Sequence, residues 1–276
     1  MSGADPKAIP PLRDVIRRFE LSARRSLGQH FLLDPNLTAR IARAAGPLEN
    51  APVIEVGPGP GGLTRALLEA GASVTAVEKD SRCVAALREL ETAYPGRLRV
   101  IEMDALEADL RALAPAPRRI VANLPYNVAT PLLIGWLRQI REDKNAFARL
   151  TLMFQKEVAE RLLAPPGTKA YGRLSVMTQW LCEGFCEFDV SPKAFVPPPK
   201  VTSAVVTLIP RAAPLGVAAV AWPAMERVVA AAFGQRRKML RQALKRIGLD
   251  PETRGIEGTR RAETLAVAEF VKLASE

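Results

Sequence analysis

Two short segments contain side chains that could bind a nucleotide and present an amine to it. The first, Glu55-Val-Gly-Pro-Gly-Pro-Gly61, follows the apolar residues Val53 and Ile54. A buried strand that breaks into glycines is typical of nucleotide sites, because glycine adopts positive φ easily and lets a ligand approach the backbone. A second apolar run ends in Glu78, whose carboxylate can accept hydrogen bonds from both hydroxyls of a ribose. Dinucleotides and S-adenosylmethionine both use this geometry, and the glycine pattern favours S-adenosylmethionine.

The second segment, Asn123-Leu124-Pro125-Tyr126, suits a planar exocyclic amine. The Asn123 side-chain carbonyl and a backbone carbonyl held out by Pro125 can each accept one hydrogen of an NH2 group, while Tyr126 offers a ring for stacking. Two acceptors that favour a more tetrahedral nitrogen would help it displace a sulfonium methyl, and proximity would contribute most of the remainder. No strong general base is then required. A plain strand-ending turn would use the same residue types, so position within the fold matters.

Apolar strands alternate with helices through the middle of the chain. We expect strands at 52–57, 73–78, 98–102, 118–123 and 147–154, with helices at 61–70, 80–93 and 130–140. This alternation predicts an α/β fold with a parallel sheet covered on both faces. Ligands in such sheets bind beyond the carboxyl ends of the strands. Glu78, Asp104 and Asn123 all fall at predicted strand ends, so we expect them on one rim.

The flanking segments have other patterns. We expect a helix at 12–20, an ordered basic loop at 24–32, and a helix that starts at Asp34 and Pro35 and runs to about Gly46. Residues 182–190 and 202–209 are predicted to form an antiparallel hairpin at the sheet edge, joined by the proline-rich segment 191–200. After Pro210 we expect only helices, at 222–234, 236–247 and 261–274.

Composition narrows the class of protein. The chain has 276 residues, 48% of them hydrophobic, which predicts a folded protein with one large and one smaller domain. No apolar run approaches the roughly 18 to 20 residues needed to span a bilayer, and residues 1–13 do not resemble a signal peptide, so we expect a cytoplasmic protein without membrane contact. Three cysteines (Cys83, Cys182, Cys186) and one histidine (His30) lack zinc-site spacing, so no metal is expected.

Charge points to a polyanionic partner. The net charge is +10, and residues 236–246 contain six basic residues and no acidic one. The candidates for RNA contact are Arg236, Arg237, Lys238, Arg241 and Lys245. We expect Lys238, Arg241 and Lys245 to project together from one helix face and to bind phosphates without reading bases. A solvated helix face would show a similar pattern. Arg24 and Arg25 are weaker candidates.

The chain resembles the ribosomal RNA adenine dimethyltransferase family, and its small-subunit branch in particular. The matching segments are Leu27-Gly-Gln-His-Phe-Leu32, Glu55 to Gly61, Glu78, Asp104-Ala105, Asn123 to Tyr126, Phe195-Val-Pro-Pro-Pro-Lys-Val-Thr-Ser203 and Phe233-Gly-Gln-Arg-Arg-Lys-Met-Leu240. They occur in family order over nearly the whole chain. The resemblance implies a class I, Rossmann-like methyltransferase with a seven-stranded, mostly parallel sheet in residues 1–210. It also implies a small helical domain in residues 211–276 that binds RNA or the ribosome.

The resemblance implies an activity as well. The expected enzyme transfers two methyl groups from S-adenosylmethionine to N6 of each of two adjacent adenines, and releases S-adenosylhomocysteine. The adenines lie in the loop of the 3′-terminal hairpin of 16S rRNA, within the 30S subunit or its precursor. We expect a monomer with a role in small-subunit biogenesis.

On the donor side, the family's motifs assign five residues. His30 and Leu32 would contact or cover the methionine portion, and Gly57 would lie against it. Glu78 would hold the ribose, and Asp104 the amine of the donor adenine. The family commonly has asparagine at the position of His30, and a ring nitrogen could replace the amide.

On the target side, Asn123 would contact both the donor and the target amine, within a motif that includes Leu124 and Pro125. Tyr126 and Phe195 would hold the flipped target base between them.

Three alternatives stay open. A 23S rRNA methyltransferase of the resistance type shares the fold and the Asn123 motif, although the Phe195 segment and the basic residues near 237 favour the small-subunit enzyme. A ribosome-assembly factor would depend mainly on binding. A dinucleotide-dependent oxidoreductase follows from the glycine loop and Glu78 alone, but it lacks an acid-base residue near the rim.

Overall fold

The computed structural model describes residues 9–23, 28–216 and 220–275. The strands that follow one another through the core are β2 (Pro52–Val56), β3 (Ser73–Glu78), β4 (Leu98–Glu102), β5 (Arg119–Asn123) and β6 (Arg149–Gln155). The helices between them are α3 (Gly62–Glu69), α4 (Ser81–Ala93) and α5 (Tyr126–Glu142). Two later strands, β7 (Cys182–Val190) and β9 (Ser203–Pro210), complete one sheet. A separate small ladder joins β1 (Phe31–Leu32) to β8 (Phe195–Val196).

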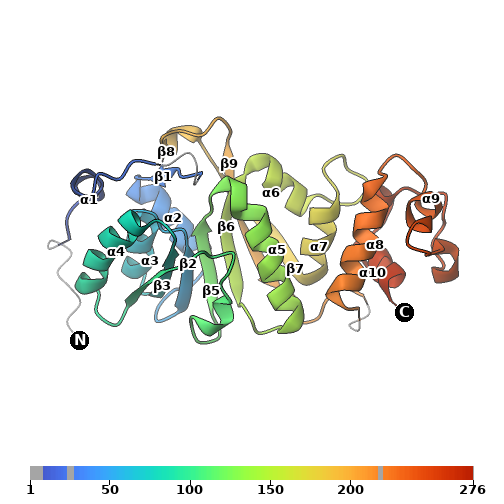
Figure 1. Ribbon diagram of the computed structural model, residues 1–276, viewed down its shortest axis with the longest axis horizontal. Coiled ribbons are helices and arrows are strands. Elements are labelled where there is room, and N and C mark those ends of the chain that lie inside the picture. The colour runs from blue at the N-terminus through green and yellow to red at the C-terminus, as the bar shows by residue number, and fades with distance from the viewer. Residues whose placement is uncertain (1–8, 24–27, 217–219, 276) are drawn as a thin grey trace. The chain divides into compact units, whose positions relative to one another are not determined.

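The seven-stranded sheet has the order β4-β3-β2-β5-β6-β9-β7 (Figure 1). The pairs β3/β4, β2/β3, β2/β5 and β5/β6 are parallel, and β9 is antiparallel to β6. This arrangement confirms the predicted α/β class, and it places β9 and β7 next to each other at one end of the sheet, with β7 as the edge strand. The strand order changes direction between β2 and β5. Strands β3 and β4 lie on one side of this point, and β6 lies on the other side. Ligands bind at such a switch point, beyond the carboxyl ends of the strands.

Local sequence signals explain how two of the helices begin. Asp34 caps α2 (Pro35–Ala44), and its carboxylate accepts hydrogen bonds from the N–H groups of Asn36 and Leu37. Pro35 at the first helical position has no N–H to lose. Helix α3 instead follows Gly61, which has a φ of 92° and lacks a capping side chain. Its start therefore depends on glycine's access to the left-handed region.

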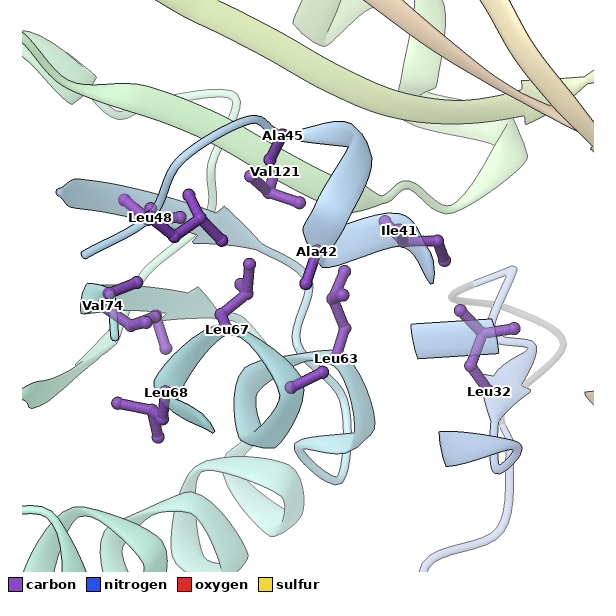
Figure 2. Packing of buried hydrophobic residues seen from close by; sticks show 14 of the residues in the cluster. Leu32, Ile41, Ala42, Ala45, Leu48, Leu63, Leu67, Leu68, Val74 and Val121 are labelled. Atoms are coloured by element: carbon purple, nitrogen blue, oxygen red, sulfur yellow. The ribbon is translucent and has the colours of Figure 1, made fainter. Parts of the chain in front are cut away.

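The core beside the site is built from leucines and small residues. Figure 2 shows Ile41 and Ala42 of α2 facing Leu63 and Leu67 of α3. Leu67 is fully buried, as is Val53 on β2. Burying a side chain of this size stabilises the fold by roughly 1.5–3 kcal/mol. This packing holds the glycine turn between β2 and α3 in place.

Contacts divide the chain into two compact units. The first comprises residues 1–136, 145–156 and 186–208, and the second comprises 137–144, 157–185 and 209–276. The first unit also contains α1 (Leu12–Arg18). The second contains α6 (Lys156–Leu163) except its first residue, and the whole of α7 (Arg173–Leu181), α8 (Trp222–Gly234), α9 (Leu240–Lys245) and α10 (Val267–Ala274). The second unit thus includes segments that precede residue 210 in the sequence. The functional division at residue 210 stays a prediction.

Several predicted boundaries are wrong. Helix α5 begins at Tyr126, four residues before the expected range, and contains Pro131. The Pro125 carbonyl accepts the N–H groups of Val128 and Ala129, so the first turn forms directly after the strand. Helices α6 and α7 were not predicted. Residues 24–27, which include the candidates Arg24 and Arg25, lie outside the described residues.

The expected helix at 236–247 is also too long. The observed α9 covers only Leu240–Lys245, and the preceding residues form a turn in which the Lys238 N–H donates to the Gln235 carbonyl. The N–H groups of Leu240 and Arg241 donate to the carbonyls of Arg260 and Gly258. These bonds to a distant loop fix where the helix starts, and periodicity alone does not reveal them. The predicted helix at 261–274 likewise reduces to a 3-10 turn, Ala262–Thr264, followed by α10.

Candidate active site

One pocket at the carboxyl ends of β2, β3 and β5 brings together most of the predicted site residues. Its lining includes His30, Leu32, Gly57, Glu78, Asp104, Asn123, Leu124, Pro125 and Tyr126. These residues come from segments almost one hundred positions apart in sequence. The expectation that strand ends share one rim is therefore confirmed for Glu78, Asp104 and Asn123.

The glycine turn forms one wall of this pocket. Gly57, Gly59 and Gly61 have φ values of 68°, 56° and 92°, a region that other residues rarely adopt. The Gly59 N–H donates to Glu78 Oε2 at 2.9 Å. The turn is thus tied to the end of the neighbouring strand, and its exposed backbone can approach a ligand closely.

Glu78 is a buried acid that the backbone already holds. Its Oε1 accepts the N–H groups of Lys79 and Asp80, each at 2.8 Å, in addition to the bond from Gly59 to Oε2. Burial raises the pKa of Glu78, while these three N–H groups act in the opposite direction. A carboxylate has about four acceptor positions, so about one stays available, on Oε2. This geometry fits one strong bond to a ribose hydroxyl better than two.

Asp104 lies at the pocket with its carboxylate engaged on both oxygens. Lys79 Nζ lies 2.6 Å from Oδ2, and the Leu106 N–H donates to Oδ1 at 3.0 Å. The hydrogen bond from Lys79 is the main cause that lowers the pKa of Asp104. Lys79 is a pocket residue that the sequence interpretation missed, and its position directly after Glu78 was the available signal.

Glu55 is a second missed residue, although it opens the glycine motif. Glu55 belongs to the residues that line the pocket, is 1% exposed, and has an Oε2 atom without a hydrogen-bond partner among the described residues. Burial raises the pKa of Glu55 to about 8, opposed by the nearby Thr64 hydroxyl and reinforced by Glu78. A positively charged ligand close to this buried acid would therefore favour its ionised form.

Asn123 ends β5 with its side chain at the pocket. Its Nδ2 donates to the His30 carbonyl at 3.1 Å. An amide that donates through Nδ2 can still accept through Oδ1. The bond to His30 therefore orients the Asn123 amide and leaves its Oδ1 able to accept a hydrogen from a ligand.

Tyr126 starts α5 and lies next to two polar or aromatic neighbours. Its hydroxyl lies 2.5 Å from the Ser203 Oγ, and its ring centroid lies 5.5 Å from that of His30. Burial raises the pKa of the Tyr126 hydroxyl. The Tyr126 side chain is thus held by its hydroxyl, which contacts Ser203, and by its ring, which contacts His30, while the residue still lines the pocket.

Phe195 is the one predicted catalytic residue that does not line the pocket. Its ring is 2% exposed and belongs to the core cluster that contains Leu32 and Leu63. Leu32 and Phe195 are paired in the β1–β8 ladder. The expected stacking of Phe195 on a base stays a prediction, and it would require this ring to leave the core.

The predicted RNA-binding residues belong to the second unit and differ in environment. Arg237, Lys238, Arg241 and Lys245 are exposed. Arg236 is partly buried and forms an ion pair with Glu263, with 2.7 Å between Nε and Oε2. It also donates to the Lys169 carbonyl at 2.7 Å. The expectation of an uncompensated cluster is thus wrong at Arg236, because an acid distant in sequence folds back onto it.

Metal-ligating clusters and membrane-spanning helices are both absent from the described part of the chain. Within residues 9–23, 28–216 and 220–275, there is no group of three or more His, Cys, Asp or Glu side chains arranged to hold a metal ion. Over the same residues, no helix combines the length and apolar character that a bilayer span requires.

Comparisons with known proteins agree with this geometry. The family model described as "Ribosomal RNA adenine dimethylase" matches residues 20–276. Proteins named "Ribosomal RNA small subunit methyltransferase A" are 60% identical in Rhodospirillum rubrum, over 96% of this chain and 92% of that protein, and 60% identical in Azorhizobium caulinodans, over 97% and 92%.

Solved structures extend the likeness to the fold. A dimethyladenosine transferase from Plasmodium falciparum has a TM-score of 0.72 at 27% identity, covering 88% of this chain and 96% of that one. The 23S rRNA methyltransferase ErmE has a TM-score of 0.65 at 29% identity, covering 88% and 98%. The seven-stranded sheet is therefore that of a class I methyltransferase, and the chain belongs to the ribosomal RNA adenine dimethylase family.

Proposed function

We propose that this protein uses S-adenosylmethionine to dimethylate N6 of two adjacent adenines in the loop of the 3′-terminal hairpin of 16S rRNA. The substrate would be the 30S subunit or its precursor in the cytoplasm, and S-adenosylhomocysteine would be the product. The observation that carries the proposal is Asn123, held at the sheet's switch point beside Gly57 and Tyr126 in one pocket. Relatives at 60% identity carry the small-subunit name, whereas the 23S enzyme is 29% identical.

The pocket fits a cationic methyl donor. Glu55, Glu78 and Asp104 all line it, and Glu55 carries a buried oxygen without a partner among the described residues. When bound, S-adenosylmethionine supplies an electrophilic methyl group on a positively charged sulfur. Ionised carboxylates favour such a charge over the neutral product, and a positive charge close to Glu55 would lower the raised pKa of that group. Gly57 would lie against the methionine portion, with Leu32 and the main chain of His30 nearby.

The remaining donor contacts follow from the acids. Glu78 would accept one ribose hydroxyl through its remaining acceptor position. Asp104 accepts one hydrogen bond on each oxygen, so about two of its acceptor positions stay available for the donor adenine's amine.

The target amine would be held by two oxygens. Asn123 Oδ1 is the first. The Pro125 carbonyl is taken up by the first turn of α5, so the Leu124 carbonyl is the candidate for the second. Together they would orient the nitrogen lone pair towards the methyl group, and Tyr126 would stack on the base. The amine proton would pass to solvent after transfer, without a general base.

RNA affinity would come from the exposed basic residues of the C-terminal part. We assign phosphate contact to Arg237, Lys238, Arg241 and Lys245, and a smaller share to Arg236, since its ion pair with Glu263 competes. The protein would act as a monomer without a metal, with residues 1–210 providing the chemistry and 211–276 the ribosome contact.

Substitutions separate chemistry from binding. We expect Asn123→Ala or Tyr126→Ala to abolish methyl transfer to unmethylated 30S particles while particle binding is retained. Loss of particle binding together with activity would contradict this division. In a thermal-shift assay, S-adenosylmethionine should raise the melting temperature and NAD should not.

A further inference from the structure

We propose that the His30 side chain is a positioning residue for the target adenine, which fastens the Phe195 loop (residues 191–202) to strand β1 and does not donate to the carboxylate of the methyl donor. The inference deepens the proposed function and rests on it. It concerns the position where the family commonly has asparagine.

The hydrogen bond made by the ring determines which nitrogen carries the proton. His30 Nδ1 lies 2.7 Å from the Pro197 carbonyl oxygen. A carbonyl oxygen only accepts, so Nδ1 must donate. In the neutral ring Nε2 is then bare and can only accept. The carboxylate of the donor's methionine portion also only accepts, so the neutral ring cannot form a hydrogen bond with it. Only the ammonium group of that portion could donate to Nε2.

The Phe195 loop needs such a fastening because its ladder is short. Only Phe31 with Val196 and Leu32 with Phe195 are paired between β1 and β8. The next three residues are prolines, which have no N–H to donate and cannot extend the ladder. Val196 is 53% exposed, so its side chain adds little packing. The bond from His30 to Pro197 continues the attachment where the ladder ends.

Ring contacts link the same side chain to the residues proposed to hold the base. The His30 ring lies 5.5 Å from that of Tyr126, at an interplanar angle of 33°, and 6.3 Å from that of Phe195, edge-on at 78°. Aromatic pairs at these separations are attractive. His30 thus fixes the Phe195 loop relative to Tyr126, which lines the pocket.

The main chain of His30 serves the other half of the site independently. Its carbonyl accepts the Asn123 Nδ2, and this bond does not depend on the side chain at position 30. Substitutions of His30 therefore test the loop fastening and leave the orientation of Asn123 in place.

The test compares His30→Ala with His30→Asn in the full-length protein. Three quantities are measured: the Kd for S-adenosylmethionine by calorimetry, hydrogen exchange of residues 191–202, and kcat and KM with unmethylated 30S particles. His30→Ala should leave the donor Kd within about twofold, speed exchange in the loop, and raise KM for the particle by roughly tenfold. His30→Asn places an amide N–H near the position of Nδ1, so it should restore slow exchange and most of the KM.

Two outcomes would overturn the proposal. One is a donor Kd about tenfold weaker in His30→Ala with unchanged loop exchange, which would make His30 a donor ligand. The other is no change in either quantity. If the wild-type protein fails to methylate 30S particles, the proposed function fails, but the Kd and exchange measurements still decide whether His30 fastens the loop.

Discussion

At the scale of single residues, the site is a set of buried and partly buried polar groups, held by neighbouring residues as well as by distant segments. Glu78 accepts three backbone N–H groups, Asn123 donates to His30, and Asp104 pairs with Lys79. Glu55 differs from them, because its Oε2 has no partner among the described residues. A buried carboxyl in this state is unstable as an anion, so it should influence both folding and ligand charge.

Glu55→Gln should change how stability depends on pH. Burial raises the pKa of Glu55 from 4.5 to about 8. The folded protein therefore binds this proton more tightly than the unfolded chain. The resulting stabilisation is complete below about pH 4.5 and is lost as the pH rises to about 8. The melting temperature of Glu55→Gln relative to wild type should thus increase between pH 5 and pH 8, by the equivalent of a few kcal/mol.

The control for this experiment is Glu102→Gln, which makes the same substitution at an exposed position. A gap between Glu55→Gln and wild type that stays constant from pH 5 to pH 8 would show that Glu55 titrates normally in the folded protein.

Tyr126 offers a second test at this scale, because its ring and its hydroxyl have separate partners. The hydroxyl contacts Ser203, while the ring lines the pocket. Tyr126→Phe keeps the stacking surface and should lower kcat/KM for the 30S particle by less than about tenfold. Tyr126→Ala should lower it by at least about a hundredfold, since base stacking contributes roughly 1–3 kcal/mol and orientation is lost as well. Equal losses in the two variants would assign the role to the hydroxyl.

At the scale of elements, the glycine turn is built by close packing as much as by backbone freedom. A Cβ atom on Gly62 would lie 2.5 Å from the Leu32 carbonyl oxygen, closer than van der Waals contact permits. Helix α3 and strand β1 can therefore approach each other only because Gly62 has no side chain. This contact fixes Leu32, which lines the pocket.

Gly62→Ala should accordingly displace β1. We expect a loss of about 1–3 kcal/mol in the free energy of unfolding and weaker binding of S-adenosylmethionine. The matched control is Gly135→Ala on α5, where an added Cβ meets no atom within 4 Å beyond its chain neighbours and the backbone of its own helix. That variant should gain about 0.5–1 kcal/mol, because alanine favours a helix over glycine. Denaturant unfolding measures both, and equal stability of Gly62→Ala and wild type would refute the packing argument.

The sequence predicted those elements whose signals are local. The strand that ends at Glu78 and the helix cap at Asp34 were predicted correctly, because an apolar run and a capping residue can each be recognised within a few residues of sequence. The start of α9 was predicted wrongly, since it depends on bonds from Leu240 and Arg241 to a loop around Arg260. The strand ends could also be assigned to one rim, because each strand is recognised from its local pattern. The burial of Phe195 could not be predicted, because it depends on packing against residues that are distant in sequence.

At the scale of the whole molecule, the net charge of +10 is the feature that most concerns the partner. Exposed cations that neutralise phosphates release counterions, so RNA affinity should fall with salt. Replacing Arg237, Lys238, Arg241 and Lys245 by alanine should reduce the slope of log K against log salt by about 0.7–0.9 for each phosphate that the variant no longer neutralises.

Arg236→Ala provides the contrast for this measurement. Because Arg236 pairs with Glu263, its loss should lower stability and change the slope less than any of the four exposed residues. An unchanged slope in the fourfold variant would mean that these residues form a solvated face and that RNA binds elsewhere.

The most direct test of the central claim is mass spectrometry of the 3′-terminal 16S rRNA fragment. Unmethylated 30S particles would be incubated with the protein and S-adenosylmethionine, with Asn123→Ala as the control. We expect four added methyl groups, two on each of the adjacent adenines, with wild type and none with Asn123→Ala. Methylation of 23S rRNA instead, or undiminished methylation by Asn123→Ala, would contradict it.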